Sequence, residues 1–301
     1  MKEKTMGCDV APMDLWFYSS LGTYDLDVRC EMLAELAYDG ICPTLWCDSA
    51  WADVPRLRDV RQRFGLDVPS AFAYLEGPGD AAGLERVAGL LREGEGPRRL
   101  ELAILSSGAE LPVSDARGDD AVLGMLEPLL ALAEERSIPL CLYPHAQWWM
   151  ERTEDAVRLC ERLQHPLLRL TFSSFHWYAT DGRDLGARLA LARPWLELVN
   201  LCGSRRVGAD LPTFEPLWEG ELDSFAVLGE LRRVGYEGSV ELLGYGIGGD
   251  VYERLQRSLA TVRELEARLG RHPGWAPPGP EVFPDLPAVI ELDATNPRSA
   301  Q

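Results

Sequence analysis

Short apolar runs alternate along this chain with longer segments in which apolar residues recur at helical spacing. A short apolar run that stops at glycine, proline or serine is typical of a buried parallel strand, and the spaced segments are typical of amphipathic helices. The pattern predicts eight strands, at residues 14–19, 41–47, 68–75, 99–105, 139–145, 167–173, 197–202 and 239–243. A predicted helix follows each strand, at residues 27–37, 54–64, 81–92, 120–137, 153–163, 185–192, 224–234 and 251–269.

Eight strand–helix units in one domain-length chain predict an α/β fold, a (β/α)8 TIM barrel over residues 1–270. A doubly wound sheet is the alternative, but it favours a glycine-rich phosphate turn after the first strand, and Ser19-Ser20-Leu21-Gly22 is not such a turn. Residues 271–301 form a Pro-rich C-terminal tail without a clear period. This tail is either a strap across the barrel or a mobile segment.

Composition narrows the classes of partner. The chain has 30 Lys and Arg against 48 Asp and Glu, a formal charge of −18, which disfavours nucleic acid and anionic membranes and leaves a small neutral or polar ligand. The N-terminus lacks the apolar core of a secretory signal, and no apolar run is long enough to cross a bilayer. Seven cysteines without a Cys-x-x-Cys pair indicate reduced thiols. We therefore expect a cytoplasmic protein; its oligomeric state is left open.

The stretch from Pro139 to Arg152 is the first candidate site. Side chains alternate along a strand, so Tyr143 and His145 share one face, and they point into the barrel if helices cover the leucines of the other face. His176 follows the next predicted strand. An imidazole titrates near neutrality, so His145 and His176 are candidate general acids or bases, and Tyr143 a candidate donor to a developing enolate. The alternatives are structural histidines at the rim and a tyrosine that fills the barrel.

Other candidates lie near the same predicted strand ends. Glu76 and Glu151 are candidate bases or solvated loop acids. Aromatic rings suit stacking on a sugar, or else they pack loops onto the barrel; the candidates are Trp148, Trp149, Trp177 and Tyr245. Arg205, with the glycine-rich loop at residues 244–249, is a candidate for phosphate binding or a solvent-exposed arginine.

The order of motifs resembles the xylose isomerase-like TIM barrels known as sugar phosphate isomerases/epimerases. The resemblance covers about residues 14–269 and rests on five segments. These are Ala37-Tyr38-Asp39-Gly40-Ile41, Leu142-Tyr143-Pro144-His145 with Trp149-Met150-Glu151-Arg152, Phe175-His176-Trp177, Gly235-Tyr236-Glu237-Gly238 and Tyr245-Gly246-Ile247-Gly248-Gly249-Asp250.

The resemblance implies a divalent metal held by Glu, Asp, His and Glu at the ends of strands five to eight. Tyr143, Ser173, Asn200 and Leu243 stand at those positions, and together they offer no anionic oxygen or imidazole at neutral pH. We therefore expect no metal ligands and no cofactor. A divalent metal (Mn, Mg or Zn) is expected only if a shifted alignment makes Glu241 a ligand; a buried ion pair is the other interpretation of Glu241. Asn200 is then a candidate for binding a sugar hydroxyl.

Two hypotheses follow. The first is a sugar isomerase/epimerase-like enzyme that moves a proton next to a carbonyl of a carbohydrate or polyol. The second is a non-catalytic barrel that binds a sugar-like ligand or a protein partner. The only lysines are Lys2 and Lys4, so Schiff-base chemistry is not expected.

Overall fold

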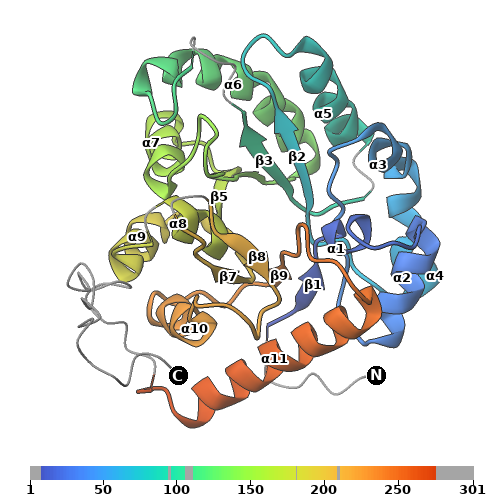
Figure 1. Cartoon of the computed structure of the whole chain (residues 1–301). Coiled ribbons are helices and arrows are strands. Elements are labelled where there is room, and N and C mark those ends of the chain that lie inside the picture. The colour runs from blue at the N-terminus through green and yellow to red at the C-terminus, as the bar shows by residue number, and fades with distance from the viewer. Residues whose placement is uncertain (1–7, 94–95, 106–110, 181, 209–210, 276–301) are drawn as a thin grey trace.

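The computed structural model describes residues 8–93, 96–105, 111–180, 182–208 and 211–275. A parallel sheet with the strand order β1-β9-β6-β5-β4-β3-β2 lies at its centre, and helices surround it (Figure 1). The strands are β1 (Val10–Pro12), β2 (Ala71–Leu75), β3 (Leu100–Ile104), β4 (Leu140–Leu142), β5 (Leu168–Ser173), β6 (Leu196–Leu201) and β9 (Val240–Leu242).

Residues 40–44 close the gap between β1 and β2. Cys42 is bridged to Met13 at the end of β1, and Thr44 is bridged to Phe72 on β2. Pro43 lies between them and has no N–H to donate, so this segment makes isolated bridges instead of a continuous ladder. With this segment in the eighth strand position, the TIM barrel predicted from the sequence is confirmed.

The helices follow the strands in the predicted order. They are α1 (Leu15–Tyr18), α2 (Leu26–Glu35), α3 (Asp48–Ala52), η1 (Val54–Asp59), α4 (Val60–Phe64), α5 (Ala81–Glu93), η3 (Ala116–Gly118), α6 (Asp119–Arg136), α7 (Thr153–Leu163), α8 (Ser174–Thr180), α9 (Leu185–Ala192), α10 (Ser224–Arg233) and α11 (Val251–Arg271). A small antiparallel hairpin, β7 (Gly203–Arg205) with β8 (Thr213–Glu215), follows β6.

Two local predictions are wrong. The first strand is Val10–Pro12, and residues 15–18 of the predicted strand are helical. The chain turns at Asp14. The buried carboxylate of Asp14 accepts hydrogen bonds from Arg29 Nη1 (2.8 Å) and the Thr44 amide (2.8 Å), and these contacts hold the turn that ends the strand. Residues 174–180 are also helical, as α8, although no helix was predicted between the strand at 167–173 and the helix at 185–192.

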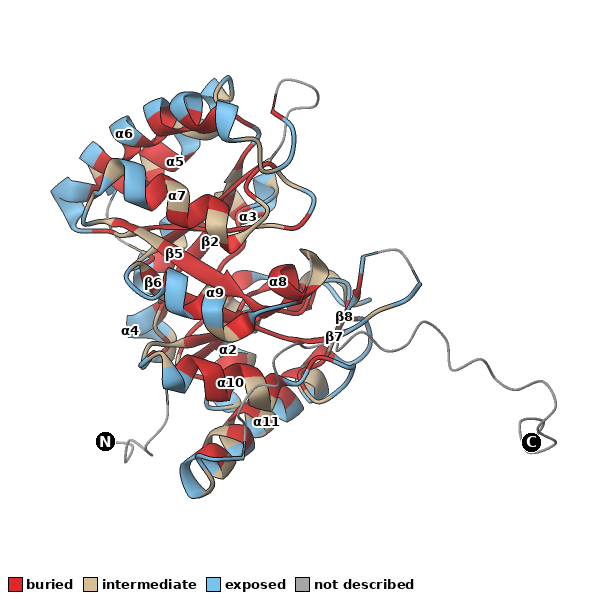
Figure 2. Ribbon diagram, turned by 90° about the vertical axis from the view of Figure 1, so that its left-hand side faces the viewer, coloured by how far each residue is buried: buried red, intermediate tan, exposed pale blue. Residues whose placement is uncertain are grey.

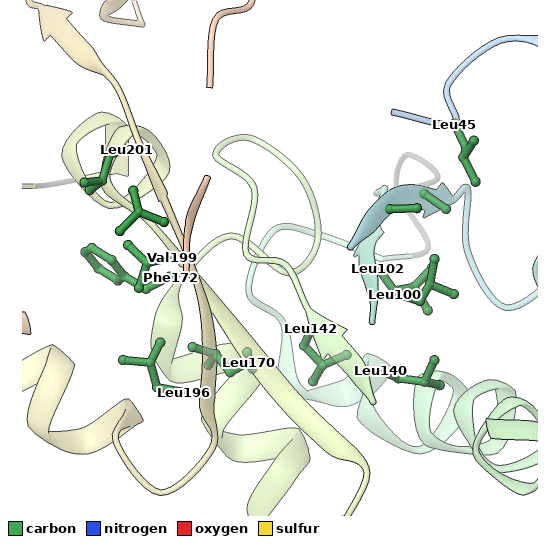
Figure 3. Packing of buried hydrophobic residues seen from close by; sticks show 14 of the residues in the cluster. Leu45, Leu100, Leu102, Leu140, Leu142, Leu170, Phe172, Leu196, Val199 and Leu201 are labelled. Carbon is green, nitrogen blue, oxygen red and sulfur yellow. The ribbon is translucent and has the colours of Figure 1, made fainter. Parts of the chain in front are cut away.

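Two apolar clusters form the core. Leucines of β3 to β6, such as Leu102, Leu142 and Leu170, lie in a cluster with the inner faces of the helices (Figures 2 and 3). A second cluster joins side chains from strands that are not neighbours. For example, Phe72 on β2 contacts Tyr143, which directly follows β4, and this contact lies inside the barrel. The expected split between leucine and tyrosine faces is thus confirmed.

The last helix, α11, ends at Arg271. The rest of the predicted tail from residue 276 lies outside the described residues. Among the helices that the structure describes, none is long and apolar enough to cross a membrane.

Candidate active site

The candidate site lies at the carboxyl ends of β4 and β5. Pro144 lies two residues after the end of β4. In the tight loop that follows, the His145 amide donates to the Met150 carbonyl (2.8 Å) and Gln147 adopts a left-handed φ of 69°. β5 passes directly into α8, which carries His176 in its first turn. This arrangement brings the two imidazoles together, with ring centroids 3.9 Å apart and planes inclined by 38°.

Ala146 fixes the tautomers of both imidazoles. Nδ1 of His145 lies 3.0 Å from the Ala146 carbonyl oxygen, which can only accept, so this nitrogen carries the proton and Nε2 has a free lone pair. The Ala146 amide donates to Nδ1 of His176 (3.2 Å), so the proton of a neutral His176 is on Nε2. The pair therefore offers one acceptor and one donor.

Burial keeps both imidazoles neutral. It lowers the pKa of His145 to about 4. It also lowers the pKa of His176 well below its usual value, and the neighbouring His145 adds to this effect. Among the residues that the structure describes, no carboxylate lies within hydrogen-bonding distance of either ring. At neutral pH both can exchange hydrogen bonds with an uncharged ligand.

Tyr143 lies below the histidines in the barrel interior. Its ring is 5.4 Å from the His176 ring and 4.9 Å from the Phe72 ring. Burial raises the pKa of its phenol well above the usual value, and the nearby Glu101 raises it further. The phenol therefore stays protonated, and it can form hydrogen bonds with a ligand only as a neutral group.

Neither of the two predicted bases is hydrogen-bonded to this pair in the part of the chain that the structure describes. Glu151 accepts a hydrogen bond from the Gln147 amide (2.8 Å), so its carboxylate supports the loop after β4. It also lines a small cavity of about 10 Å³ beside His176, which is room for about one water molecule. Glu76 is exposed at the end of β2. The structure thus places no contact between either carboxylate and the histidines among the described residues.

The aromatic candidates divide into two groups. Trp148 is half-buried and stacks on His145 with ring centroids 3.9 Å apart, and Tyr245 is 47% exposed. Trp149 is fully buried, and its indole Nε1 donates to the Asp115 carbonyl (3.1 Å). Trp177 is also buried, and its Nε1 donates to the Arg183 carbonyl (2.9 Å). Trp148 and Tyr245 are therefore accessible from the barrel mouth, whereas Trp149 and Trp177 pack the core.

The candidate phosphate ligand, Arg205, is half exposed on β7. Its guanidinium lies 4.0 Å from Glu215 and 3.9 Å from Glu221. These two carboxylates offset its charge, which makes it a poor site for a phosphate group.

A layer of buried polar groups crosses the barrel below Tyr143. Asn200 Nδ2 donates to Glu241 (2.7 Å) and lies 3.4 Å from Glu101, and Ser70 donates to the other Glu241 oxygen (2.5 Å). Burial raises the pKa of both carboxyls. The predicted alternative, an ion pair at Glu241, is wrong, because the groups bonded to its carboxyl are Asn200, Ser70, Cys42 and the Glu101 carboxyl, and none of them is a cation. Sequence reasoning missed Glu101, although its alternation with Leu100 and Leu102 marks it as facing inward.

The four positions of the resemblance do not fit a divalent metal. The Tyr143 phenol stays protonated, Leu243 has no donor atom, and Asn200 is bonded to Glu241. Both Glu241 oxygens already accept hydrogen bonds. Within the described ranges, no group of three or more His, Cys, Asp or Glu side chains is arranged to hold a metal ion.

Comparisons with known proteins identify the family and the fold. A family model described as xylose isomerase-like TIM barrel matches residues 30–261. No curated protein sequence matches the chain. The fold is similar to that of 3-keto-D-glucoside 4-epimerase from E. coli, with a TM-score of 0.66 and 17% identity over 85% of this chain and 99% of that one.

Two further solved structures share the fold. The IolI protein with a bound zinc atom has a TM-score of 0.71 and 14% identity, over 87% of this chain and 97% of that one. D-psicose 3-epimerase with D-tagatose from Clostridium cellulolyticum H10 has a TM-score of 0.66 and 13% identity, over 85% of this chain and 99% of that one.

Proposed function

The chain belongs to the xylose isomerase-like TIM barrel family, and we propose that it binds a neutral sugar or related polyol at the mouth of its barrel and moves a proton next to a carbonyl of that ligand. This is the chemistry of an isomerase or epimerase. The observation that carries the proposal is the pair of neutral, oppositely tautomeric imidazoles of His145 and His176 at the strand ends. Epimerases of sugars among the similar structures support it.

Each group has a role in the proposed step. Nε2 of His145 removes a proton from the carbon next to the carbonyl, and the electron pair of that C–H bond forms the enol double bond. Nε2–H of His176 donates a hydrogen bond to the carbonyl oxygen as negative charge develops there, so His176 keeps its proton and stays neutral. Tyr143 donates a hydrogen bond to the developing charge. The protonated His145 then returns the proton to the adjacent carbon, which gives the isomer. A proton that reaches the original carbon from the opposite face, supplied by solvent while His145 releases its own, gives the epimer.

This step needs no metal ion from the four positions of the resemblance, whose side chains do not fit one. The proposal therefore includes the loss of the metal ligands of the family, with the histidine pair as the acid and base. Trp148, stacked on His145, forms one wall for the sugar ring, and Asn200 stays in the buried layer below.

The test is proton exchange. A panel of aldoses, ketoses and keto-glycosides is incubated with the protein in D2O, and deuterium incorporation next to the carbonyl is followed by NMR. His145→Ala and His176→Ala are expected to lower the exchange rate about 100-fold or more. His165→Ala is the matched control, because this histidine contacts Glu134 (3.1 Å) away from the mouth. Unchanged exchange in both site variants would contradict the assignment.

A non-catalytic sugar-binding barrel is the second candidate. Two observations favour it: no carboxylate among the described residues is bonded to either histidine, and an imidazole with a pKa of about 4 is a weak base. Saturable binding of a sugar without any exchange or turnover would support this candidate over the first.

A further inference from the structure

A line of aromatic rings runs around the mouth of the barrel. We call it the aromatic rim, and in spatial order it comprises Tyr18, Trp46, Tyr245, Phe214, His176, His145, Trp148 and Tyr74. Each ring centroid lies between 3.9 and 6.5 Å from the next. Its members are on or after β1, the 40–44 segment, β2, β4, β5, β6 and β9. The loop after β3 lies mostly outside the described residues.

The aromatic rim has two chemically different halves. One half holds the histidine pair and Trp148. In the other half, Trp46 and Tyr245 lie 5.9 Å apart with a T-shaped geometry, and Phe214 links them to His176 through contacts of 5.6 and 6.5 Å. Trp46 is 36% exposed and Tyr245 is 47% exposed. Exposed aromatic faces gathered next to a candidate site indicate a surface that binds an apolar group.

The surrounding contacts hold this apolar half in place. The Gly246 amide donates to Ser19 Oγ (3.1 Å), which ties the loop after β9 to the loop after β1. Gly246 has a φ of 71°, a left-handed conformation that favours glycine. Arg29 lies 4.6 Å from the centre of the Tyr18 ring and donates to its hydroxyl (3.2 Å). The rings are therefore positioned before a ligand binds.

The nearby charges favour an uncharged ligand. Arg205 on β7 is offset by Glu215 and Glu221, and Arg254 lies 3.6 Å from Glu219. Arg29 pairs with the buried Asp14 (2.8 Å). These three guanidinium groups are therefore engaged with carboxylates, and a phosphorylated ligand gains little from them.

We infer that the ligand is a neutral sugar derivative with a flat apolar group, of the chemical class of an aryl glycoside. Its sugar part faces His145 and His176, and its flat group packs against Trp46 and Tyr245. This inference rests on the proposed function, because it assigns the sugar part to the histidine half. It goes beyond that function, because it assigns the apolar half to an aglycone.

The test compares matched ligands. Binding of phenyl and methyl glycosides of glucose, galactose, mannose and xylose, together with glucose 6-phosphate, is measured by titration calorimetry. The phenyl member of the preferred pair is expected to bind about tenfold more tightly than the methyl member. Trp46→Ala and Tyr245→Ala are expected to abolish this difference and to leave the affinity for the methyl glycoside unchanged. Trp275→Ala, an exposed tryptophan after α11, is the control and should keep the difference.

The outcomes separate the two proposals. Equal affinities for phenyl and methyl glycosides would overturn the aglycone inference and leave the proposed function standing. Preferred binding of the sugar phosphate would overturn the aglycone inference and also the uncharged ligand of the proposed function. No binding of any sugar would contradict both. A tenfold preference that survives Trp46→Ala and Tyr245→Ala, in variants with unchanged melting temperatures, would overturn the assignment of these two rings.

Discussion

His145 and His176 are held by opposite polar groups of one residue, Ala146. Its carbonyl oxygen accepts from His145 Nδ1 at 3.0 Å, and its amide donates to His176 Nδ1 at 3.2 Å. The Nε2 atoms of the two rings consequently differ: Nε2 of His145 has a lone pair, and Nε2 of His176 carries a proton. One residue therefore sets which nitrogen of each ring carries the proton.

The first prediction concerns the pH dependence of turnover. The proposed base, His145, acts only when neutral, and burial lowers its pKa to about 4. For the substrate found in the exchange screen, kcat/KM is expected to stay level from about pH 8 to pH 5 and to fall as the pH approaches 4. A fall centred near pH 6.5, the usual imidazole value, would show that His145 is solvated or is not the base.

The second prediction separates the adjacent tryptophans. Trp149 fills the core, so Trp149→Ala is expected to lower the free energy of unfolding by about 3–5 kcal/mol. Trp148→Ala is expected to cost less stability and to weaken sugar binding, because Trp148 stacks on His145. Urea unfolding and titration calorimetry measure the two effects. Equal losses of stability would contradict the assigned difference in burial.

The third prediction concerns the buried carboxyl of Glu101. Its folded-state pKa is raised by burial and by Glu241, so the folded protein retains a proton that the unfolded chain releases. Stability from this group is present below the unfolded pKa and is lost as the pH rises toward the folded pKa. Glu101→Gln, which mimics the protonated form, is expected to gain stability over the wild type by about 1 kcal/mol or more between pH 5 and pH 8.

The matched control for Glu101→Gln is Glu135→Gln, a change at an exposed position on α6. Urea unfolding at both pH values gives the comparison. A difference between Glu101→Gln and the wild type that does not vary with pH would mean that the Glu101 carboxyl does not retain its proton in the folded state.

The fourth prediction concerns metals. Titration calorimetry of chelator-treated protein with Mn²⁺, Mg²⁺ and Zn²⁺ is expected to show no tight stoichiometric binding, because Tyr143 and Leu243 offer no anionic ligand. Tight binding that disappears in Glu241→Gln and survives in Glu135→Gln would instead identify Glu241 as a ligand and restore metal-assisted chemistry.

Several features of the fold followed from local sequence patterns. The predicted strands 99–105 and 167–173 contain β3 and β5, and helix 153–163 coincides with α7. The first strand was misplaced by a few residues. Residues 14–19 have a strand-like apolar composition, but Asp14 bonds to Arg29 and to the Thr44 amide, and no local pattern contains those partners.

The sequence by itself determined the succession of strands and helices and the inward face of Tyr143, because periods of two and 3.6 residues are properties of the local chain. Only the tertiary structure decided that Trp148 is accessible and Trp149 buried, and that Glu241 meets Asn200 and Ser70 across the barrel. It also decided the tautomers of His145 and His176. Apart from the local contact between His145 and Ala146, these features depend on contacts between residues far apart in the sequence, whose distances are set by barrel closure and not by their spacing along the chain.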